Sequence, residues 1–237
     1  FHQTLELVKE LDPNRLAVFN YAHVPWMKKT MRKFDEATLP SINEKLNILK
    51  DIIEFFTTNG YKMVGMDHFA KEDDELFLAI EKGELHRNFQ GYTTKGGNDL
   101  IGIGVTSIGD GAMHYAQNHK DLREYEKALD DNRLPIMKGY ALSIDDKIRQ
   151  AIIMDMMSNF KLNIQKIEQD FDISFFEYFK DEIKALDEFI EADLLTISDK
   201  SIEVNETGSM LIRNIVMSFD SYLKKIPENK RQFSKTI

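Results

Sequence analysis

Residues 41–66 read SINEKLNILKDIIEFFTTNGYKMVGM, a helix with both of its end signals followed directly by a strand. Ser41 and Glu44 have the spacing of a capping box, in which each side chain satisfies a backbone N–H at the helix start. Apolar residues then recur on one helical face, and Asn59 with Gly60 is a typical helix stop. The closing YKMVGM is short and apolar, which indicates a buried strand.

A strand is also expected before this helix. Residues 16–20, LAVFN, form a short apolar run after Pro13, which ends a first helix. Apolar residues at helical spacing mark that first helix: Leu5, Val8 and Leu11. A strand, a helix and a second strand in this order favour a right-handed parallel crossover, so the pattern predicts an α/β fold.

Residues 65–94, GMDHFAKEDDELFLAIEKGELHRNFQGYTT, join a polar strand end to an acidic helix and a polar-aromatic run. Asp73 and Asp74 are expected to open the helix, whose positive end favours carboxylates, and Gly83 to close it. HRNFQGYTT at residues 86–94 is expected to form one strand. Its alternate residues would then line a polar pocket or face solvent: His86, Asn88, Gln90 and Tyr92.

Two loops carry polar groups that could belong to a site. Tyr21, Ala22 and His23 follow the first predicted strand, and Asp67 and His68 follow the second. In a β/α barrel the loops after the strands build the active site, which makes both loops candidates. The two histidines could equally bind only loop backbone, and their spacing matches no metal-ligand motif.

A glycine-interrupted strand is expected near residue 100. Residues 99–109 read DLIGIGVTSIG, and Gly102 and Gly104 would allow either tight strand packing or close approach of a ligand to the backbone. The segment lacks the third glycine, placed before a helix, that a dinucleotide-binding fingerprint requires.

The second half of the chain is expected to be a separate, mainly α-helical domain. All six histidines lie at or before His119 and helical patterns follow, so we divide the chain into residues 1–118 and 119–237. A small hairpin is expected near residues 194–204 and a last helix at about 206–225. Helices combined with such a hairpin resemble a winged-helix arrangement.

Two further capping-box spacings, Ser143 with Asp146 and Ser174 with Glu177, predict helix starts in that domain. One broad apolar helix face is expected there, formed by Phe175, Phe176, Phe179, Ile183, Leu186, Phe189 and Ile190. An aromatic stripe of this kind is typical of a packed core.

The composition limits the classes of function. Lys and Arg number 31 against 40 Asp and Glu, so the net charge of −9 gives no long-range attraction to nucleic acid. No apolar run reaches the roughly 18 to 20 residues of a membrane span, and we expect a cytoplasmic protein with no nucleic-acid and no membrane partner. Without cysteine, these residues alone provide no disulfide, thiolate nucleophile or thiolate metal ligand. A start on Phe1, already inside an element, indicates a piece of a longer protein.

Several segments, in their order along the chain, resemble the oxygen-independent coproporphyrinogen III oxidase family: RLAVFNYAHVPW (15–26), residues 65–94, GIGVTSIG (102–109), YAQN (115–118), RNIVMSFDSYL (213–223) and QFSKTI (232–237). The resemblance implies a radical S-adenosylmethionine (SAM) enzyme of haem biosynthesis, which converts two propionates of coproporphyrinogen III to vinyl groups by oxidative decarboxylation. It also implies a fold: the C-terminal part of a partial, TIM-like β/α barrel, followed by a mainly α-helical, winged-helix-like C-terminal domain.

The CxxxCxxC motif of this family lies upstream of the matching segments, so the ligands of its [4Fe–4S] cluster are not expected in this chain. The resemblance therefore implies no catalytic and no metal-binding residue here, and a chain that is inactive alone. It places Ala22 beside one of two SAM molecules and Ile108 beside the other, with Phe89 and Gln90 as pocket residues near them.

The resemblance also implies partners. These are coproporphyrinogen III as the substrate and an electron donor protein, for a parent enzyme that is monomeric. The strand at residues 16–20 would have an open edge in this piece, which predicts self-association or disorder near the N-terminus.

Two other functions stay open from the sequence. One is a haem chaperone or haem-modifying radical SAM relative, and the other is a non-catalytic winged-helix module that binds through a locally basic tail. That tail carries six cations: Arg213, Lys224, Lys225, Lys230, Arg231 and Lys235. Arg213 and some of the others are expected to hold substrate carboxylates. Lys224 and Lys225 would also be favoured at a helix C-terminus without any ligand.

Overall fold

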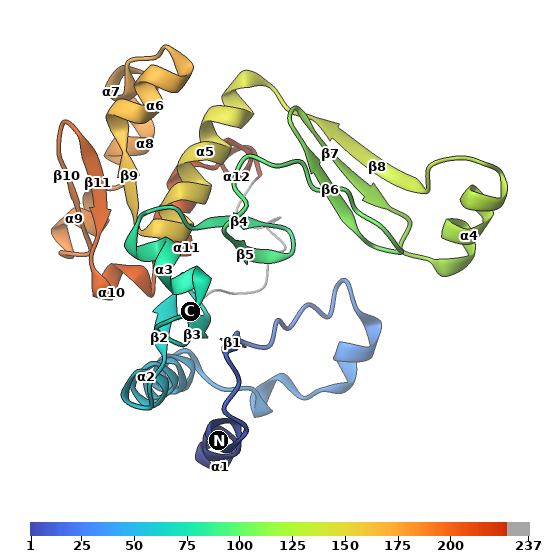
Figure 1. Cartoon of the computed structure of the whole chain (residues 1–237), viewed down its shortest axis with the longest axis horizontal. Helices are drawn as coiled ribbons and strands as arrows, with labels where there is room; N and C mark the ends of the chain where they lie inside the picture. The colour runs from blue at the N-terminus through green and yellow to red at the C-terminus, as the bar shows by residue number, and fades with distance from the viewer. Residues whose placement is uncertain (227–237) are drawn as a thin grey trace.

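The computed structural model of the chain describes residues 1–226, which form three three-stranded sheets, one two-stranded hairpin and the helices between them (Figure 1). The predicted basic residues Lys230, Arg231 and Lys235 lie outside this range. The first elements are α1 (His2–Leu11), β1 (Arg15–Ala17), the 3-10 helices η1 (Lys29–Lys33) and η2 (Glu36–Thr38), α2 (Ile42–Thr58), β2 (Lys62–Val64) and β3 (His68–Ala70).

Helix α2 begins and ends where the sequence predicts. Ser41 Oγ accepts a hydrogen bond from the Glu44 N–H at 3.3 Å, and Glu44 Oε2 accepts one from the Ser41 N–H at 2.8 Å. Its apolar face packs against α1 and β3 in one buried cluster: Leu5, Ile52, Phe56, Tyr61 and Phe69. The sequence was sufficient to predict the start of this helix because the capping contacts join residues only three positions apart.

The predicted parallel direction of the first two strands is confirmed, and β3 is an additional strand that the pattern did not indicate. β1 and β2 run in the same direction, but β3 lies between them and pairs antiparallel with both, in the order β1-β3-β2. Gly65 explains this return, because its φ of +61° allows a tight turn directly after β2. β1 is shorter than the predicted strand at 16–20, and β2 is shorter than the one predicted at 61–66. His68 lies within β3 instead of in a loop after a strand.

The middle of the chain holds α3 (Glu75–Glu81), β4 (His86–Asn88) and β5 (Gly91–Thr93). α3 starts as predicted, since Asp74 Oδ1 accepts a hydrogen bond from the Leu76 N–H at 2.8 Å. HRNFQGYTT, predicted as one strand, is the β4–β5 hairpin. Asn88 Oδ1 accepts from the Gln90 N–H at 2.8 Å and Gly91 takes φ +129°, so a side-chain turn reverses the chain.

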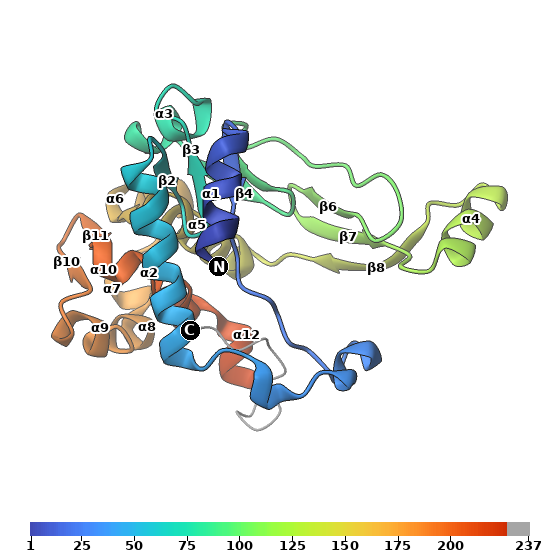
Figure 2. The same ribbon diagram turned by 90° about the horizontal axis from the view of Figure 1, so that it is seen from below.

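Four elements form what we call the arm: β6 (Ile108–Gly111), β7 (His114–Asn118), α4 (Leu122–Asp130) and β8 (Ile136–Ala141). The antiparallel sheet β6-β7-β8 projects from the remainder of the molecule with α4 at its far end, as both views show (Figures 1 and 2). The sheet takes strands from both sides of the expected division at residues 118 and 119, and that division stays a prediction.

The strand predicted at residues 99–109 is wrong over most of its length. Leu100 makes a single antiparallel bridge to Asp110, and β6 begins only at Ile108. Gly104 at φ +96° and Thr106 at φ +65° turn the chain between them. Left-handed backbone at two nearby positions does not allow a continuous strand.

The C-terminal part contains α5 (Ile144–Asn159), β9 (Lys161–Asn163), α6 (Ile164–Phe171), α7 (Phe175–Tyr178), α8 (Lys180–Lys184), α9 (Asp187–Glu191), β10 (Leu195–Ile197), β11 (Ser201–Val204), α10 (Glu206–Ser209), α11 (Ile212–Val216), η3 (Met217–Phe219) and α12 (Ser221–Lys225). The predicted hairpin near 194–204 is confirmed as β10 and β11, and β9 pairs with its second strand. The capping box of Ser143 and Asp146 is confirmed at the start of α5.

Three expectations for this part are corrected. Ser174 makes no capping contact, and Glu168 Oε1 accepts a hydrogen bond from the neighbouring Phe175 N–H at 2.9 Å. The expected helix at 206–225 is four short segments, the last of which starts anew where Asp220 Oδ1 accepts from the Tyr222 N–H. The predicted apolar face likewise belongs to three short helices, α7 to α9.

The largest buried cluster surrounds α5 and includes Ile152, Met156, Phe175, Phe179 and Phe219, none of which has any exposed surface. Burying side chains of this size contributes about 1.5–3 kcal/mol each. α5 therefore is the scaffold on which the C-terminal helices and the β9–β11 sheet pack. Among residues 1–226, no helix is long and apolar enough to cross a membrane.

Candidate functional site

A cavity of about 640 Å³ lies where the N-terminal sheet, the β4–β5 hairpin, α5 and α11 meet. Its lining comes from segments far apart in the sequence: residues 17–22, 49, 52, 66–68, 87–91, 110, 154, 210 and 212–214. Its polar groups come from the loop after β1, the turn after β2, the β4–β5 hairpin, β6 and α11. A volume of this size is in the range of small-molecule and cofactor sites.

Three of the four residues predicted to bind the cofactor line this one cavity. Ala22 comes from the loop after β1, and Phe89 and Gln90 occupy the tip of the hairpin. Ile108 is not among the lining residues, although Asp110, two residues later on β6, is. The Phe89 ring stands perpendicular to Tyr115 of the arm at 5.2 Å between centroids, which fixes the hairpin tip against β7.

Asp67, His68 and Arg213 form a charged group in the cavity wall. Asp67 Oδ1 lies 2.6 Å from His68 Nδ1, and Asp67 Oδ2 lies 3.4 Å from Arg213 Nη2. Burial acts to raise the pKa of Asp67, but the His68 hydrogen bond and the charges of Arg213 and Arg87 outweigh it and lower that pKa. Asp67 therefore stays ionised and holds the Arg213 guanidinium beside it in the cavity wall.

His23 has a different role from His68. Its ring lies outside the cavity lining, with Nε2 3.3 Å from Glu36 Oε1 and Nδ1 3.4 Å from the Tyr21 hydroxyl. These contacts stay within the long loop between β1 and α2. Of the two histidines considered from the sequence, His68 belongs to the cavity and His23 to the loop.

Tyr92 packs against His68 and holds the backbone next to Asp67 in place. Its hydroxyl accepts a hydrogen bond from the Met66 N–H at 3.0 Å and donates to the Met157 carbonyl at 3.4 Å, while its ring stands perpendicular to that of His68. Burial raises the pKa of Tyr92, so it acts as a neutral donor. The sequence pattern assigned Tyr92 to one face of a strand and did not indicate this role.

The arm side of the cavity carries a second polar group. Asp110 and Tyr115 are cross-strand partners, and Gln150 Nε2 of α5 donates to the Tyr115 hydroxyl. Burial raises the pKa of Asp110, which the nearby charge of Lys147 partly offsets. Burial and the neighbouring carboxylates raise the pKa of Tyr115 to about 12.

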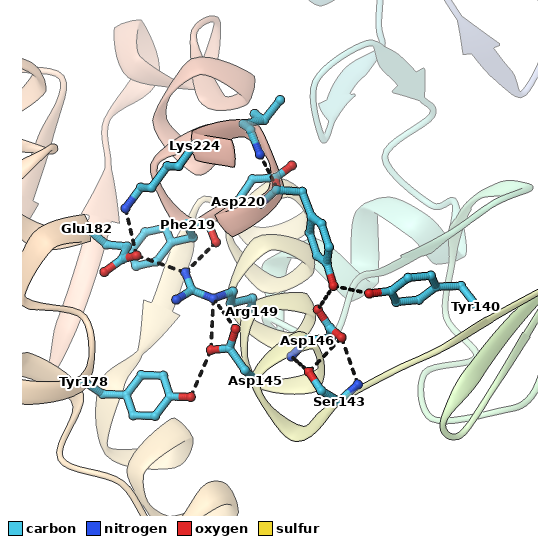
Figure 3. Close-up of polar contacts among 12 residues, drawn as sticks. Tyr140, Ser143, Asp145, Asp146, Arg149, Tyr178, Glu182, Phe219, Asp220 and Lys224 are labelled. Atoms are coloured by element: carbon cyan, nitrogen blue, oxygen red, sulfur yellow. Dashed lines mark hydrogen bonds and ion pairs between the residues drawn. The ribbon is translucent and has the colours of Figure 1, made fainter. Parts of the chain in front are cut away.

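A polar network outside the cavity holds the C-terminal segment in place (Figure 3). Arg149 of α5 donates to Asp145, to Glu182 Oε1 at 3.1 Å and to the Phe219 carbonyl at 2.9 Å. Lys224 lies 2.8 Å from the same Glu182 oxygen. Lys224 thus serves an internal ion pair at the end of α12, where the sequence had left a substrate role open.

No group of three or more His, Cys, Asp or Glu side chains in the described range could hold a metal ion. The whole sequence contains no cysteine, so it offers no thiolate ligand. The residues that meet in the cavity are instead suited to binding an organic molecule that carries negative charge.

Comparisons with known proteins identify relatives of this chain. The sequence profile described as the HemN C-terminal domain matches residues 142–211. Oxygen-independent coproporphyrinogen III oxidase of Helicobacter pylori is 55% identical over all of this chain and 51% of its own length. The enzyme of the same name from Thermostichus vulcanus is 42% identical over all of this chain and 73% of its own length.

A solved structure gives the same result for the fold. Coproporphyrinogen III oxidase from Escherichia coli, described as a radical SAM enzyme, superposes with a TM-score of 0.89 at 46% identity and covers 94% of this chain and 51% of that one. The chain spans about half the length of most of the curated relatives that it matches.

Proposed function

The chain belongs to the oxygen-independent coproporphyrinogen III oxidase family, and from this premise we propose that it is the C-terminal portion of an enzyme that converts two propionates of coproporphyrinogen III to vinyl groups. The observation that carries the proposal is the shared cavity. Ala22, Phe89 and Gln90, assigned to a cofactor pocket by resemblance alone, line it together with Arg213.

The lining fits a nucleoside cofactor such as SAM. Ala22 has a small side chain that lets a ligand approach the backbone, Phe89 offers an aromatic face that is half exposed, and the amide of Gln90 offers both a donor and an acceptor. When SAM is bound, the chemistry supplied is abstraction of a hydrogen atom from a propionate chain. Formation of the vinyl group would also require loss of carbon dioxide and transfer of one electron to an acceptor outside this chain. The role of Ile108 rests on resemblance, since it lies outside the lining.

The charged wall fits the substrate. Coproporphyrinogen III carries four carboxylates, and Arg213 is held by Asp67 with one guanidinium nitrogen while half of its side chain stays exposed. A guanidinium positioned in this way can bind a propionate and orient the macrocycle. We propose positioning as the role of Arg213.

Other features of the parent enzyme are also proposals. A [4Fe–4S] cluster would be held by residues outside this chain, because this sequence has no cysteine. An electron donor protein would supply reducing electrons, and the reaction would take place in the cytoplasm in a monomeric enzyme. β1 is an edge strand of its sheet, which favours self-association of this chain by itself.

The proposed function is tested with the complete gene product that contains these residues. We expect anaerobic incubation with SAM, a reductant and coproporphyrinogen III to form protoporphyrinogen IX, with 5′-deoxyadenosine released, as measured by chromatography. Absence of both products from a preparation with intact cluster absorbance would reject the proposal.

Gln90→Ala tests the cavity within the same assay. Because Gln90 lines the pocket, we expect a loss of about tenfold or more in kcat/KM, the size of one lost hydrogen bond to a bound ligand. Gln165→Ala is the matched control, since Gln165 is exposed on α6 away from the cavity. Equal activity of the two variants would contradict the assignment of Gln90.

A further inference from the structure

Arg87 of β4 is a half-buried cation in the cavity wall, and among the described residues its guanidinium makes no hydrogen bond and no ion pair. Within the described residues its Nε is buried and makes no hydrogen bond. Its Cζ lies 5.7 Å from the ring of Tyr92, the residue opposite it in the hairpin, and both belong to the group around Asp67. A buried N–H without an acceptor costs free energy, so the position favours a ligand that supplies one.

The nearest carboxylate does not satisfy this group. The two oxygens of Asp67 already face His68 Nδ1 at 2.6 Å and Arg213 Nη2 at 3.4 Å. Two guanidinium groups thus share one carboxylate on this wall. The other lining carboxylate, Asp110, lies on the arm and interacts with Lys147. One positive charge at Arg87 is left for an anion from outside the chain.

We propose that Arg87 is a carboxylate-binding residue of the cavity, an inference that rests on the proposed function and extends it. Nε–H and one Nη–H of a guanidinium form a fork that matches the two oxygens of a carboxylate. Two ligands of the proposed reaction carry that group: a propionate of the tetrapyrrole and the amino-acid end of SAM. Arg87 and Phe89 line the same cavity from one hairpin, so a ligand bound there could bring either carboxylate to Arg87.

The test compares ligands that differ only in the carboxylate, using Arg87→Met in the complete gene product. Dissociation constants are measured by calorimetry for coproporphyrin III and its tetra-amide, and for SAM and decarboxylated SAM. We expect binding of one carboxylate-bearing ligand to weaken about tenfold to a hundredfold, with less than twofold change for its carboxylate-free counterpart. The affected pair identifies the source of the carboxylate.

Two further variants complete the experiment. Arg133→Met removes an exposed arginine that is ion-paired with Asp131 on the arm, and we expect it to change no dissociation constant. Arg87→Lys keeps the charge but not the fork, and we expect an intermediate loss. It also serves if Arg87→Met does not fold. Values within twofold of wild type for all four ligands, or equal losses with and without the carboxylate, overturn the inference.

This result is distinguishable from that of the proposed function. If the wild-type enzyme turns over normally and both Arg87 variants bind all four ligands as the wild type does, only the proposed carboxylate site is rejected. Absence of turnover together with a carboxylate-dependent loss of binding sinks the proposed reaction alone. A wild-type protein that binds neither coproporphyrin III nor SAM overturns both.

Discussion

Gly65 lies directly against the ring of Tyr92, which packs beneath the cavity. Its φ is +61°, and a Cβ built on it would collide with the ring of Tyr92. We expect Gly65→Ala to lower the free energy of unfolding by about 2–4 kcal/mol, of which about 1 kcal/mol is backbone strain and the rest displacement of Tyr92. Gly83→Ala is the control, because Gly83 has a φ of +67° and an added Cβ there would meet no atom within 4 Å. Urea unfolding that gave equal losses for the two variants would contradict the role of Tyr92.

At this scale, local signals in the sequence reached only part of the site. Ala22, Phe89 and Gln90 were found through resemblance, and the structure brings them into one cavity. The pairing of Asp67 with Arg213 joins positions 146 residues apart, and no local pattern contains such a contact. The open fork of Arg87 depends on which oxygens of Asp67 are already taken, which only the folded arrangement shows.

Helix α12 contacts both α5 and the arm through the side chain of Tyr222. The Tyr222 hydroxyl donates to Asp146 Oδ1 at 2.6 Å and also bonds to the hydroxyl of Tyr140 on β8 (Figure 3). Asp146 is buried, so we expect Tyr222→Phe to cost about 1–2 kcal/mol of stability at neutral pH. Tyr178→Phe is the control, because Asp145 keeps its contacts with Arg149. If thermal unfolding showed equal losses of stability for the two variants, the stabilising role of the Tyr222–Asp146 hydrogen bond would be contradicted.

The same hydrogen bond predicts a pH dependence. Burial acts to raise the pKa of Asp146, but hydrogen bonds from Tyr222 and Ser143 outweigh it and lower that pKa. A lowered pKa in the folded state adds stability above the unfolded value of about 4, and this contribution is lost as the pH falls through the folded value. We therefore expect the difference between wild type and Tyr222→Phe to shrink below about pH 4. A difference that stayed constant from pH 7 to pH 3 would rule out the ionised Asp146 as its origin.

Among the elements, those with local determinants were predicted and those set by distant contacts were not. The capping boxes at Ser41 and Ser143 were correct because both partners lie within one turn of the helix. The one expected at Ser174 was not: its side chain makes no capping contact, and the first N–H of α7 donates to Glu168 of the preceding helix. β3 shows the same limit, because its place between β1 and β2 is a matter of pairing across the sheet.

At the scale of the whole molecule, the well-packed C-terminal part contrasts with an arm that buries little. Ile152 has no exposed surface and lies in the cluster around α5, whereas all six residues of β8 are exposed. We expect Ile152→Ala to cost about 2–5 kcal/mol and to speed amide hydrogen exchange throughout β9, β10 and β11. The amides of β6 to β8 are expected to exchange faster than these already in wild type and to change little in the variant, because the arm contributes no residue to that cluster. Ile144→Ala is the control: Ile144 begins the same helix but is 64% exposed, so its effect should stay within about 0.5 kcal/mol. If the arm lost protection in step with β9 to β11, the two parts would unfold as one unit and this contrast would be wrong.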